Sequence, residues 1–234
     1  MIIFAVDSSS CSGSAAVWRD GEILAECFCN IGLTHSETLM PLCDQTLRLA
    51  GVGPDEIDLY AVTAGPGSFT GLRIGMGIVK GMAFVQDTPC VGVPTLEALA
   101  WGLCPCDRLV LPVLDARRRR VYAAGYDCGG EMPRPLFENE LLSYDQLAEK
   151  ADGKAAVLVG DAARLCYTSI ADAGNFSLAA QSSLLVRAGN VAAAAKARFD
   201  RGLACGCGEL APIYIQLPQA ERERLARQTG EVNK

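Results

Sequence analysis

The sequence predicts an α/β protein in which helices cover the faces of a mixed β-sheet, and three observations support this prediction. Apolar runs of strand length alternate with longer amphipathic runs, in the order βββαβαβα over the first part of the chain. The 234 residues are 50% hydrophobic and 21% charged, which is typical of globular proteins and excludes general disorder. A chain of this length forms one large domain or two small ones, and needs no disulfide or metal ion to fold.

Three antiparallel strands are expected at the N-terminus. The apolar run 2–6 forms the first strand. Residues 14–18 and 22–28 form a hairpin around Asp20 and Gly21, because both residues tolerate the positive φ of a tight turn.

A helix is predicted to begin at Thr34 and to end at Gly51. Thr34 and Glu37 have the spacing of a capping box. The apolar side chains of this helix cover an arc of about 180°, whereas a helix lying on one sheet needs only about 100°. The residues of the arc are Leu39, Met40, Leu42, Cys43, Leu47, Leu49 and Ala50. The surplus predicts a second contact surface, such as a helix bundle across a subunit boundary.

A glycine-rich turn from Gly65 to Gly71 follows a predicted strand at 58–63 and precedes a helix that runs to about Phe84. Free amides at the start of such a helix can hold a phosphate group. Pro66 removes one amide, however, and no Gly-Lys-Ser/Thr follows, so the pattern is not a P-loop. A tight strand-to-helix turn without a ligand is the simpler interpretation.

The helix after this turn contains Gly71, Gly75, Gly77 and Gly81, in two pairs spaced by four residues. Each interior glycine costs about 1 kcal/mol relative to alanine, so close packing is expected to compensate. The element packed there is either part of the same domain or a helix of a partner, and the spacing leaves both alternatives open.

The second half of the chain is expected to form a smaller lobe. A strand at 90–93 and a short helix at 95–103 precede Cys104-Pro105-Cys106, a domain boundary that divides the chain into lobes 1–105 and 106–234. Strands are predicted at 109–114, 121–126, 156–159 and 212–216, with an alanine-rich helix at 184–201 and a charged helix from Pro218. This last helix could pack back on the first lobe.

The net charge disfavours a stand-alone nucleic-acid-binding protein. Lys and Arg number 21 and Asp and Glu number 27, which gives a formal charge of −6. Asp7 interrupts the first apolar run and no cationic stretch precedes it, so neither a signal peptide nor a membrane span is expected. We therefore expect a cytoplasmic protein.

The eleven cysteines are expected to be free thiols that pack as small apolar residues. Three pairs, beginning at Cys27, Cys104 and Cys205, have C-x-C spacing, whereas structural zinc sites prefer a longer spacing. His35 is the single histidine, so nitrogen ligands are scarce. A zinc site is not expected.

Few polar residues have a pattern that suggests catalysis. His35 lies in the first turn of a helix without a nucleophile paired to it, so a role near the cap or on the surface is expected. Asp7 could position a metal ion or water, or it could cap the turn of serines that follows. Arg117 to Arg120 form a dense basic cluster that could contact tRNA phosphates or a nucleotide, or could be a solvated hairpin tip.

The sequence resembles the TsaB (YeaZ) family over nearly its whole length. The resemblance depends on Asp7-Ser8-Ser9, on residues 34–41 (Thr-His-Ser-Glu-Thr-Leu-Met-Pro), on the glycine-rich block 64–75, on Asp115-Ala116-Arg117-Arg118, and on Pro212-Ile213-Tyr214. This family is a subunit of the bacterial machinery that makes threonylcarbamoyladenosine beside the tRNA anticodon. The resemblance implies an actin/hexokinase-like (ASKHA) fold of two lobes, each with a mixed sheet flanked by helices.

The resemblance also implies a subunit without catalysis. The related transferase TsaD binds a metal through an H-x-x-x-H motif, and an alignment on Glu97 places Thr95 and Leu99 at the two histidine positions. A hydroxyl and an alkyl group cannot replace two imidazoles as ligands. We therefore expect no metal or cofactor in the isolated chain, with ATP or ADP possible at a complex interface. The alternative is a stand-alone ASKHA phosphotransferase or a glycoprotease-like metallopeptidase.

The partners that the resemblance implies are a TsaD-like transferase and a TsaE-like ATPase, with tRNA bound indirectly and a homodimer when the chain is alone. The residues expected to bind the partner are His35, Leu39, Met40, Cys43, Leu47, Gly71, Arg73, Gly75, Ile78 and Met82. The residues that could contact a nucleotide or tRNA phosphate are Asp7, Arg117, Arg118 and Arg119.

Overall fold

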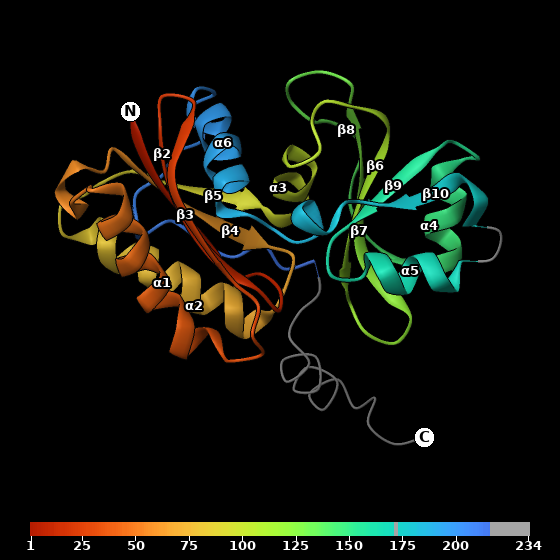
Figure 1. Cartoon of the computed structure of the whole chain (residues 1–234), viewed down its shortest axis with the longest axis horizontal. Coiled ribbons are helices and arrows are strands. Elements are labelled where there is room, and N and C mark those ends of the chain that lie inside the picture. The colour runs from red at the N-terminus through yellow and green to blue at the C-terminus, as the bar shows by residue number, and fades with distance from the viewer. Residues whose placement is uncertain (171–172, 216–234) are drawn as a thin grey trace, which may run out of the picture.

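The computed structural model describes residues 1–170 and 173–215 and has two lobes that lie side by side (Figure 1). Each lobe is built on a five-stranded sheet, with the strand orders β3-β2-β1-β4-β5 and β10-β9-β6-β7-β8. The predicted α/β architecture of two lobes is thereby confirmed. The charged helix predicted from Pro218 lies outside the described residues.

The first sheet is mixed, as predicted. Its antiparallel part comprises β1 (Ile2–Asp7), β2 (Gly13–Arg19) and β3 (Glu22–Cys29), while β4 (Leu59–Gly65) and β5 (Cys90–Pro94) run parallel to β1. Asp20 and Gly21 have φ values of 49° and 102°, so the predicted hairpin turn is confirmed. The carboxyl ends of β1, β4 and β5 therefore meet at one edge of the sheet, beside the second lobe.

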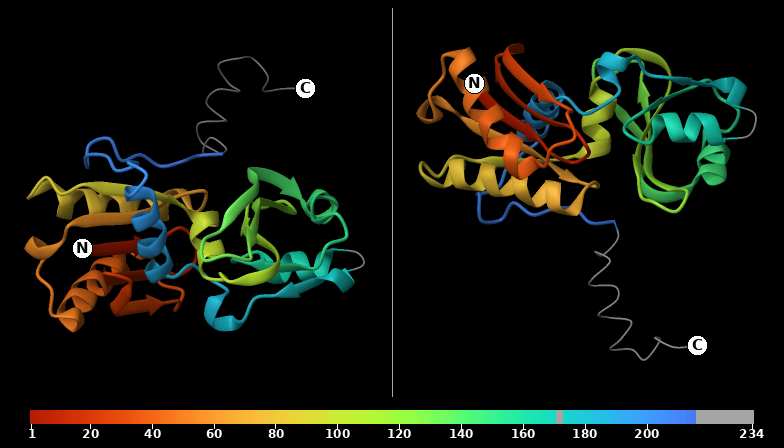
Figure 2. Two further views of the ribbon diagram at one scale, coloured as in Figure 1. Left: turned by 90° about the horizontal axis from the view of Figure 1, so that it is seen from above. Right: turned by 60° about the horizontal axis from the view of Figure 1, so that its bottom comes forward.

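Helices cover both faces of the first sheet (Figure 2). One face carries α1 (His35–Ala50) and α2 (Phe69–Phe84), with a short 3-10 helix η1 (Pro54–Glu56) between them in sequence. The other face carries α3 (Thr95–Trp101) and α6 (Ala188–Phe199). Gly51 ends α1 in the left-handed conformation, with φ 63°, as its position after the last helical residue predicts.

The second sheet has an antiparallel part of β6 (Cys106–Asp115), β7 (Arg120–Cys128) and β8 (Arg134–Ser143), and a parallel part of β9 (Ala156–Val159) and β10 (Phe176–Leu178). The helices of this lobe are α4 (Tyr144–Ala151), α5 (Ala163–Ser169), η2 (Ala173–Asn175) and η3 (Gln181–Ser183). The sequence did not predict β8, α4, α5 or β10, because their short segments mix charged and apolar residues without a clear period.

The chain crosses between the lobes twice, once after α3 and again before α6. α6 lies within the range 106–234 of the predicted smaller lobe, but it packs on β1 and β2 of the first sheet. Two ion pairs hold α6 there: Arg187 with Glu26 on β3, and Arg198 with Glu97 on α3, each at 2.8 Å. These partners are more than a hundred residues away in the sequence, which is why local patterns do not reveal the contact.

Three clusters of buried side chains form the core. One lies under α1 and α2, one fills the second lobe, and the largest extends from α3 and α6 across to β6 and β7. This largest cluster joins the two lobes, and its members on either side include Ala5, Leu96, Val191, Val110 and Tyr126. The lobes are therefore held by shared packing as well as by the two chain crossings.

The strand predicted at 212–216 is wrong for its described residues. Residues 212–214 have no regular secondary structure. One backbone bond, from Ile213 N to Ala64 O at 2.6 Å, holds the segment against the end of β4. Pro212 has no N–H to donate, so a regular ladder does not continue there.

The eleven cysteines are all free thiols, as predicted. Within residues 1–170 and 173–215, no group of three or more His, Cys, Asp or Glu side chains is arranged to hold a metal ion. None of the helices described has the length and apolar character needed to cross a membrane.

Candidate functional site

An apolar groove lies on the first lobe, between α1 and α2. Its cavity has a volume of about 250 Å³. The walls include Met40, Cys43 and Leu47 from α1, and Met82 and Val85 from the end of α2. Four of these five residues belong to the predicted partner-binding set, so the structure brings this part of the set together in one surface feature.

The side chains around this groove are unusually exposed for apolar residues. Met40 is 50% exposed and Val85 is 79% exposed. Phe84 and Leu49, on α2 and α1 but not in the lining of the groove, are exposed as well. Exposed apolar side chains that gather at a groove are typical of a surface that binds another protein. We call the surface formed by Met40, Leu47, Met82 and Val85 the α1–α2 docking surface.

Other residues of the predicted set face inward and hold α1 on the sheet. Leu39 and Cys43 are completely buried. Burial raises the pKa of the Cys43 thiol to about 12, so this cysteine behaves as an apolar side chain. His35 is half-buried, and its Nε2 lies 2.8 Å from the carbonyl oxygen of Ser10. His35 and Leu39 pack within their own lobe and do not line the groove, whereas the buried Cys43 forms part of the groove wall.

The glycines of α2 separate into two groups. Gly71 and Gly75 are buried, and a Cβ atom at either position would collide with Ser8 in the loop between β1 and β2. Ser8 Oγ also donates a hydrogen bond to Gly71 O at 2.8 Å. At these two positions the close packing is within the same domain, which is one of the two alternatives, and a partner contact there stays a prediction. A Cβ atom at Gly77 or Gly81 would meet no neighbouring atom of the described chain within 4 Å.

Arg73, Ile78 and Met82 are the other residues of the predicted partner-binding set on α2. The Arg73 guanidinium carbon lies 3.9 Å from the ring centre of Phe69, and its Nε donates to Tyr214 Oη at 3.1 Å. Arg73 therefore fixes the segment that follows residue 210 against α2. Ile78 and Met82 are half-buried against the core under α1 and α2, and Met82 also lines the groove.

A second, polar cavity of about 530 Å³ lies in the cleft between the lobes. Ser9, Ser10 and Thr70 line it from the first lobe, and Asp115, Arg117 and Asp161 line it from the second. Burial raises the pKa of Asp161. The hydrogen bond that its carboxylate accepts from Asp115 N lowers this pKa, but by less than burial raises it.

The glycine-rich turn from Gly65 to Gly71 borders this cleft. Ser68 N donates to Ser9 O at 2.7 Å, so one amide of the turn is already used within the chain. Gly67 has a φ of 158°, and a Cβ atom there would collide with Ser9. The turn therefore has a structural reason for its glycines that requires no phosphate, in agreement with the simpler interpretation.

Asp7 is completely buried at the end of β1. Its Oδ1 accepts hydrogen bonds from Ser9 N at 3.0 Å, Ser9 Oγ at 2.6 Å and Thr63 Oγ1 at 2.8 Å. Its Oδ2 has no partner among the described residues, and burial raises the pKa of this carboxyl group. Asp7 thus caps the serine turn, which was one of the two alternatives, and is too deep to line the cleft.

The turn between β6 and β7 has an unusual backbone. Arg117, Arg118 and Arg119 have φ values of 63°, 55° and 57°, all in the left-handed region. This conformation costs about 1–2 kcal/mol for each residue that is not glycine, and such strain is concentrated at functional positions in proteins. No sequence signal predicted it, because glycine, asparagine and aspartate are the usual residues at positive φ.

The two residues that the resemblance aligns with the histidines of TsaD are unsuited to bind a metal ion. Thr95 and Leu99 are buried on α3, and neither can replace an imidazole. Glu97 between them accepts a hydrogen bond from Arg198 Nη1 and so helps to hold α6. Val85 is a residue of the docking surface that the sequence did not predict, because the predicted helix ends at Phe84 and its last turn was not assigned a face.

Comparison with known proteins identifies the family of the chain and relatives of the same fold. The family model described as "TsaD: tRNA N6-adenosine threonylcarbamoyltransferase" matches residues 31–215, which is more than half of the chain. A curated relative from Bacillus subtilis, named tRNA threonylcarbamoyladenosine biosynthesis protein TsaB, is 35% identical over 54% of this chain and 55% of its own length. The relative of the same name from Escherichia coli is 37% identical over 54% of this chain and 55% of its own length. The chain spans about half the length of these curated relatives.

Two solved structures from Pseudomonas aeruginosa are similar over almost the whole chain. One is described as YeaZ, with 26% identity, a TM-score of 0.78, and coverage of 92% of this chain and 99% of that one. The other, described as an uncharacterized protein with similarity to peptidase YEAZ, has 25% identity and the same TM-score of 0.78 and coverage. The chain therefore belongs to the family described as TsaD: tRNA N6-adenosine threonylcarbamoyltransferase, and within it to the group of proteins named TsaB or YeaZ.

Proposed function

We propose that this chain is a non-catalytic subunit in the synthesis of threonylcarbamoyladenosine in tRNA, and that it binds and activates a TsaD-like transferase. The observation that carries this proposal is the α1–α2 docking surface, a groove with exposed apolar walls on a folded lobe. The names of the TsaB relatives support the pathway, and the family match supports a partner of related fold.

The docking surface fits a helical partner. Met40 and Leu47 project from one helix, and Met82 and Val85 from the end of another, so the groove between them accepts side chains of an apolar helix. Burial of apolar surface stabilises a complex by about 25 cal/mol per Å², and methionine side chains adapt to the shape of a partner. Gly77 and Gly81, exposed on α2, have open space above them, so a partner backbone can approach this helix closely.

The catalytic groups would come from the partner. Thr95 and Leu99 cannot bind the metal that the two histidines of TsaD hold, and Asp7 is used to cap a turn of its own chain. In this proposal the subunit stabilises the active conformation of the transferase. A TsaE-like ATPase joins the pair, ATP or ADP is held at a subunit interface, and tRNA is bound through the complex.

The same surface would bind a second copy of the chain when the transferase is absent. An apolar groove that is exposed on a monomer can pair with the same groove on a second copy around a two-fold axis. The expected result is a homodimer in the purified chain that dissociates when the transferase is added.

The test is a charge placed in the groove. Met40→Glu and Val85→Glu add a carboxylate where a partner would bury apolar atoms, so each should weaken binding of a TsaD-like transferase by about tenfold or more. Binding is measured by calorimetry with purified proteins. Leu136→Glu is the matched control, because Leu136 is an exposed apolar residue on β8 of the other lobe. Equal affinity of all three variants and the wild type would exclude the α1–α2 docking surface.

A further inference from the structure

We infer that the turn formed by Arg117, Arg118 and Arg119, here called the arginine turn, binds phosphate groups of the tRNA backbone. The choice of tRNA rests on the proposed function, whereas the choice of phosphate rests on the turn itself. The inference gives the chain a direct contact with RNA, in addition to the contact through its partner.

The guanidinium groups of the arginine turn are exposed and have no carboxylate partner among the described residues. Six other basic side chains of the described chain form ion pairs: Arg48, Lys150, Arg187, Lys196, Arg198 and Arg201. The adjacent Arg120 has no carboxylate partner among the described residues either, so four successive cations are unpaired, and in a chain with a formal charge of −6 such a run is a local exception. Repulsion among them favours a polyanion as their partner.

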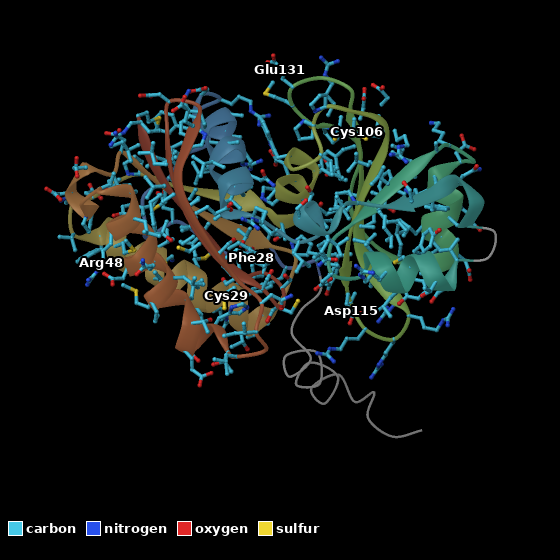
Figure 3. All side chains as sticks on the ribbon, viewed as in Figure 1. Phe28, Cys29, Arg48, Cys106, Asp115 and Glu131 are labelled. Atoms are coloured by element: carbon cyan, nitrogen blue, oxygen red, sulfur yellow. The ribbon has the colours of Figure 1, made fainter. Side chains whose placement is uncertain are left out.

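The backbone of the arginine turn is fixed before any ligand binds. Asp115 Oδ1 accepts a hydrogen bond from Arg117 N at 2.8 Å, and Ala116 N donates to Arg120 O at 3.0 Å. Asp115 N in turn donates to Asp161 Oδ1 at 2.9 Å, which ties the turn to the start of α5. Figure 3 labels Asp115 at the base of this turn, at the side of the second lobe that faces the cleft. A fixed turn loses little backbone entropy on binding, which favours affinity.

The chemistry of the arginine turn fits phosphates rather than bases. The guanidinium fork donates paired hydrogen bonds to phosphate oxygens. The Tyr144 ring, whose centre lies 5.4 Å from the Arg119 guanidinium carbon, is buried and therefore unable to stack on a nucleotide base. The contacts of the arginine turn with phosphates are expected to be independent of sequence. Arg117 also lines the cleft, so RNA bound here would lie across the mouth of the cleft.

The experiment measures binding of fluorescently labelled tRNA to the full chain at several salt concentrations. The test variant is R117Q/R118Q/R119Q, and the control R19Q/R134Q/K154Q removes three exposed cations from other elements. Both variants change the formal charge from −6 to −9, because each loses three positive charges. We expect the test variant alone to bind about tenfold more weakly and to lose about 2 units of the slope of log affinity against log salt.

Arg118→Gly keeps the proposal testable if the triple variant folds poorly. Glycine adopts the φ of 55° without strain, so this variant should be at least as stable as the wild type and still bind tRNA more weakly. Equal tRNA affinity of the test and control variants would overturn the inference. Competition by ATP at the concentration at which tRNA binds would also overturn it, in favour of a free nucleotide as the ligand.

The outcome is separable from that of the proposed function. If the wild type binds tRNA but no transferase, the proposed function alone is contradicted. If it binds the transferase but no tRNA, this inference alone is contradicted.

Discussion

The two halves of α2 both contain a pair of glycines, but one pair faces the interior of the lobe and the other faces solvent. Gly71 and Gly75 are buried against Ser8, where a Cβ atom does not fit, while Gly77 and Gly81 have open space above them. The inward pair lets the helix lie close to the loop after β1, which forms one wall of the cleft. The outward pair is exposed on the same helix that supplies Met82 to the α1–α2 docking surface. Glycine spacing alone therefore indicates close approach, but does not say whether the approaching element is internal or external.

The largest effect is expected at the inward pair. Gly75→Leu forces a branched side chain into the space that Ser8 occupies, so it should lower the free energy of unfolding by about 1–3 kcal/mol or more. Urea denaturation measures the loss. A variant of normal stability that no longer binds a TsaD-like transferase would contradict the internal role of Gly75 and would place this glycine on the docking surface.

Asp7 supports the packing of the inward glycines, because it caps the turn of serines against which they pack. Burial raises the pKa of Asp7, so the folded chain holds this proton to a higher pH than the unfolded chain. Stability is then lost as pH rises from the ordinary range of aspartate, about 4, through the raised pKa of the folded state. Asp7→Asn does not titrate, and its amide oxygen can accept the three hydrogen bonds of Oδ1.

The expected result is that the stability of Asp7→Asn relative to the wild type increases from acidic to neutral pH. Denaturation midpoints of the two proteins at a series of pH values measure it, and Asp145→Asn on the exposed start of α4 serves as the control. A stability difference between the wild type and Asp7→Asn that stays constant with pH would show that the pKa of Asp7 is the same in the folded and unfolded chain, which would contradict this prediction.

The smallest effect is expected at the outward pair. Gly77→Ala and Gly81→Ala add a methyl group in open space and restrict the unfolded chain, so each should stabilise the monomer by about 0.5–1 kcal/mol. Thermal unfolding of the isolated chain detects this gain. A loss of stability instead would mean that the outward face is closely packed in the monomer.

The elements of the first lobe were predictable from sequence because their signals are local. Asp20-Gly21 specifies its hairpin turn, Gly51 specifies the end of α1, and the alternation of strands and helices specifies a mixed sheet. The position of α6 on the first sheet was not predictable, because it depends on ion pairs of Glu26 and Glu97 with arginines far along the chain.

The candidate sites were predictable in part, for a related reason. The apolar arc of α1 includes Met40 and Leu47, which the structure places at the groove, but the arc alone could not separate them from the buried Leu39 and Cys43. Binding of a partner by this surface stays a prediction. Which side chain of a wide arc remains exposed depends on how the helix is rotated on its sheet. The left-handed backbone at Arg117 to Arg119 likewise depends on the hydrogen bond that Asp115 Oδ1 accepts from Arg117 N and on the two strands that the turn joins.

The most direct test of the docking surface is amide hydrogen exchange of the full chain, with and without a saturating TsaD-like transferase. The account predicts that protection on binding is concentrated in residues 40–47 of α1 and 77–86 at the end of α2, with no change in β8 of the second lobe. Protection confined to the second lobe, with unchanged exchange in α1 and α2, would contradict it.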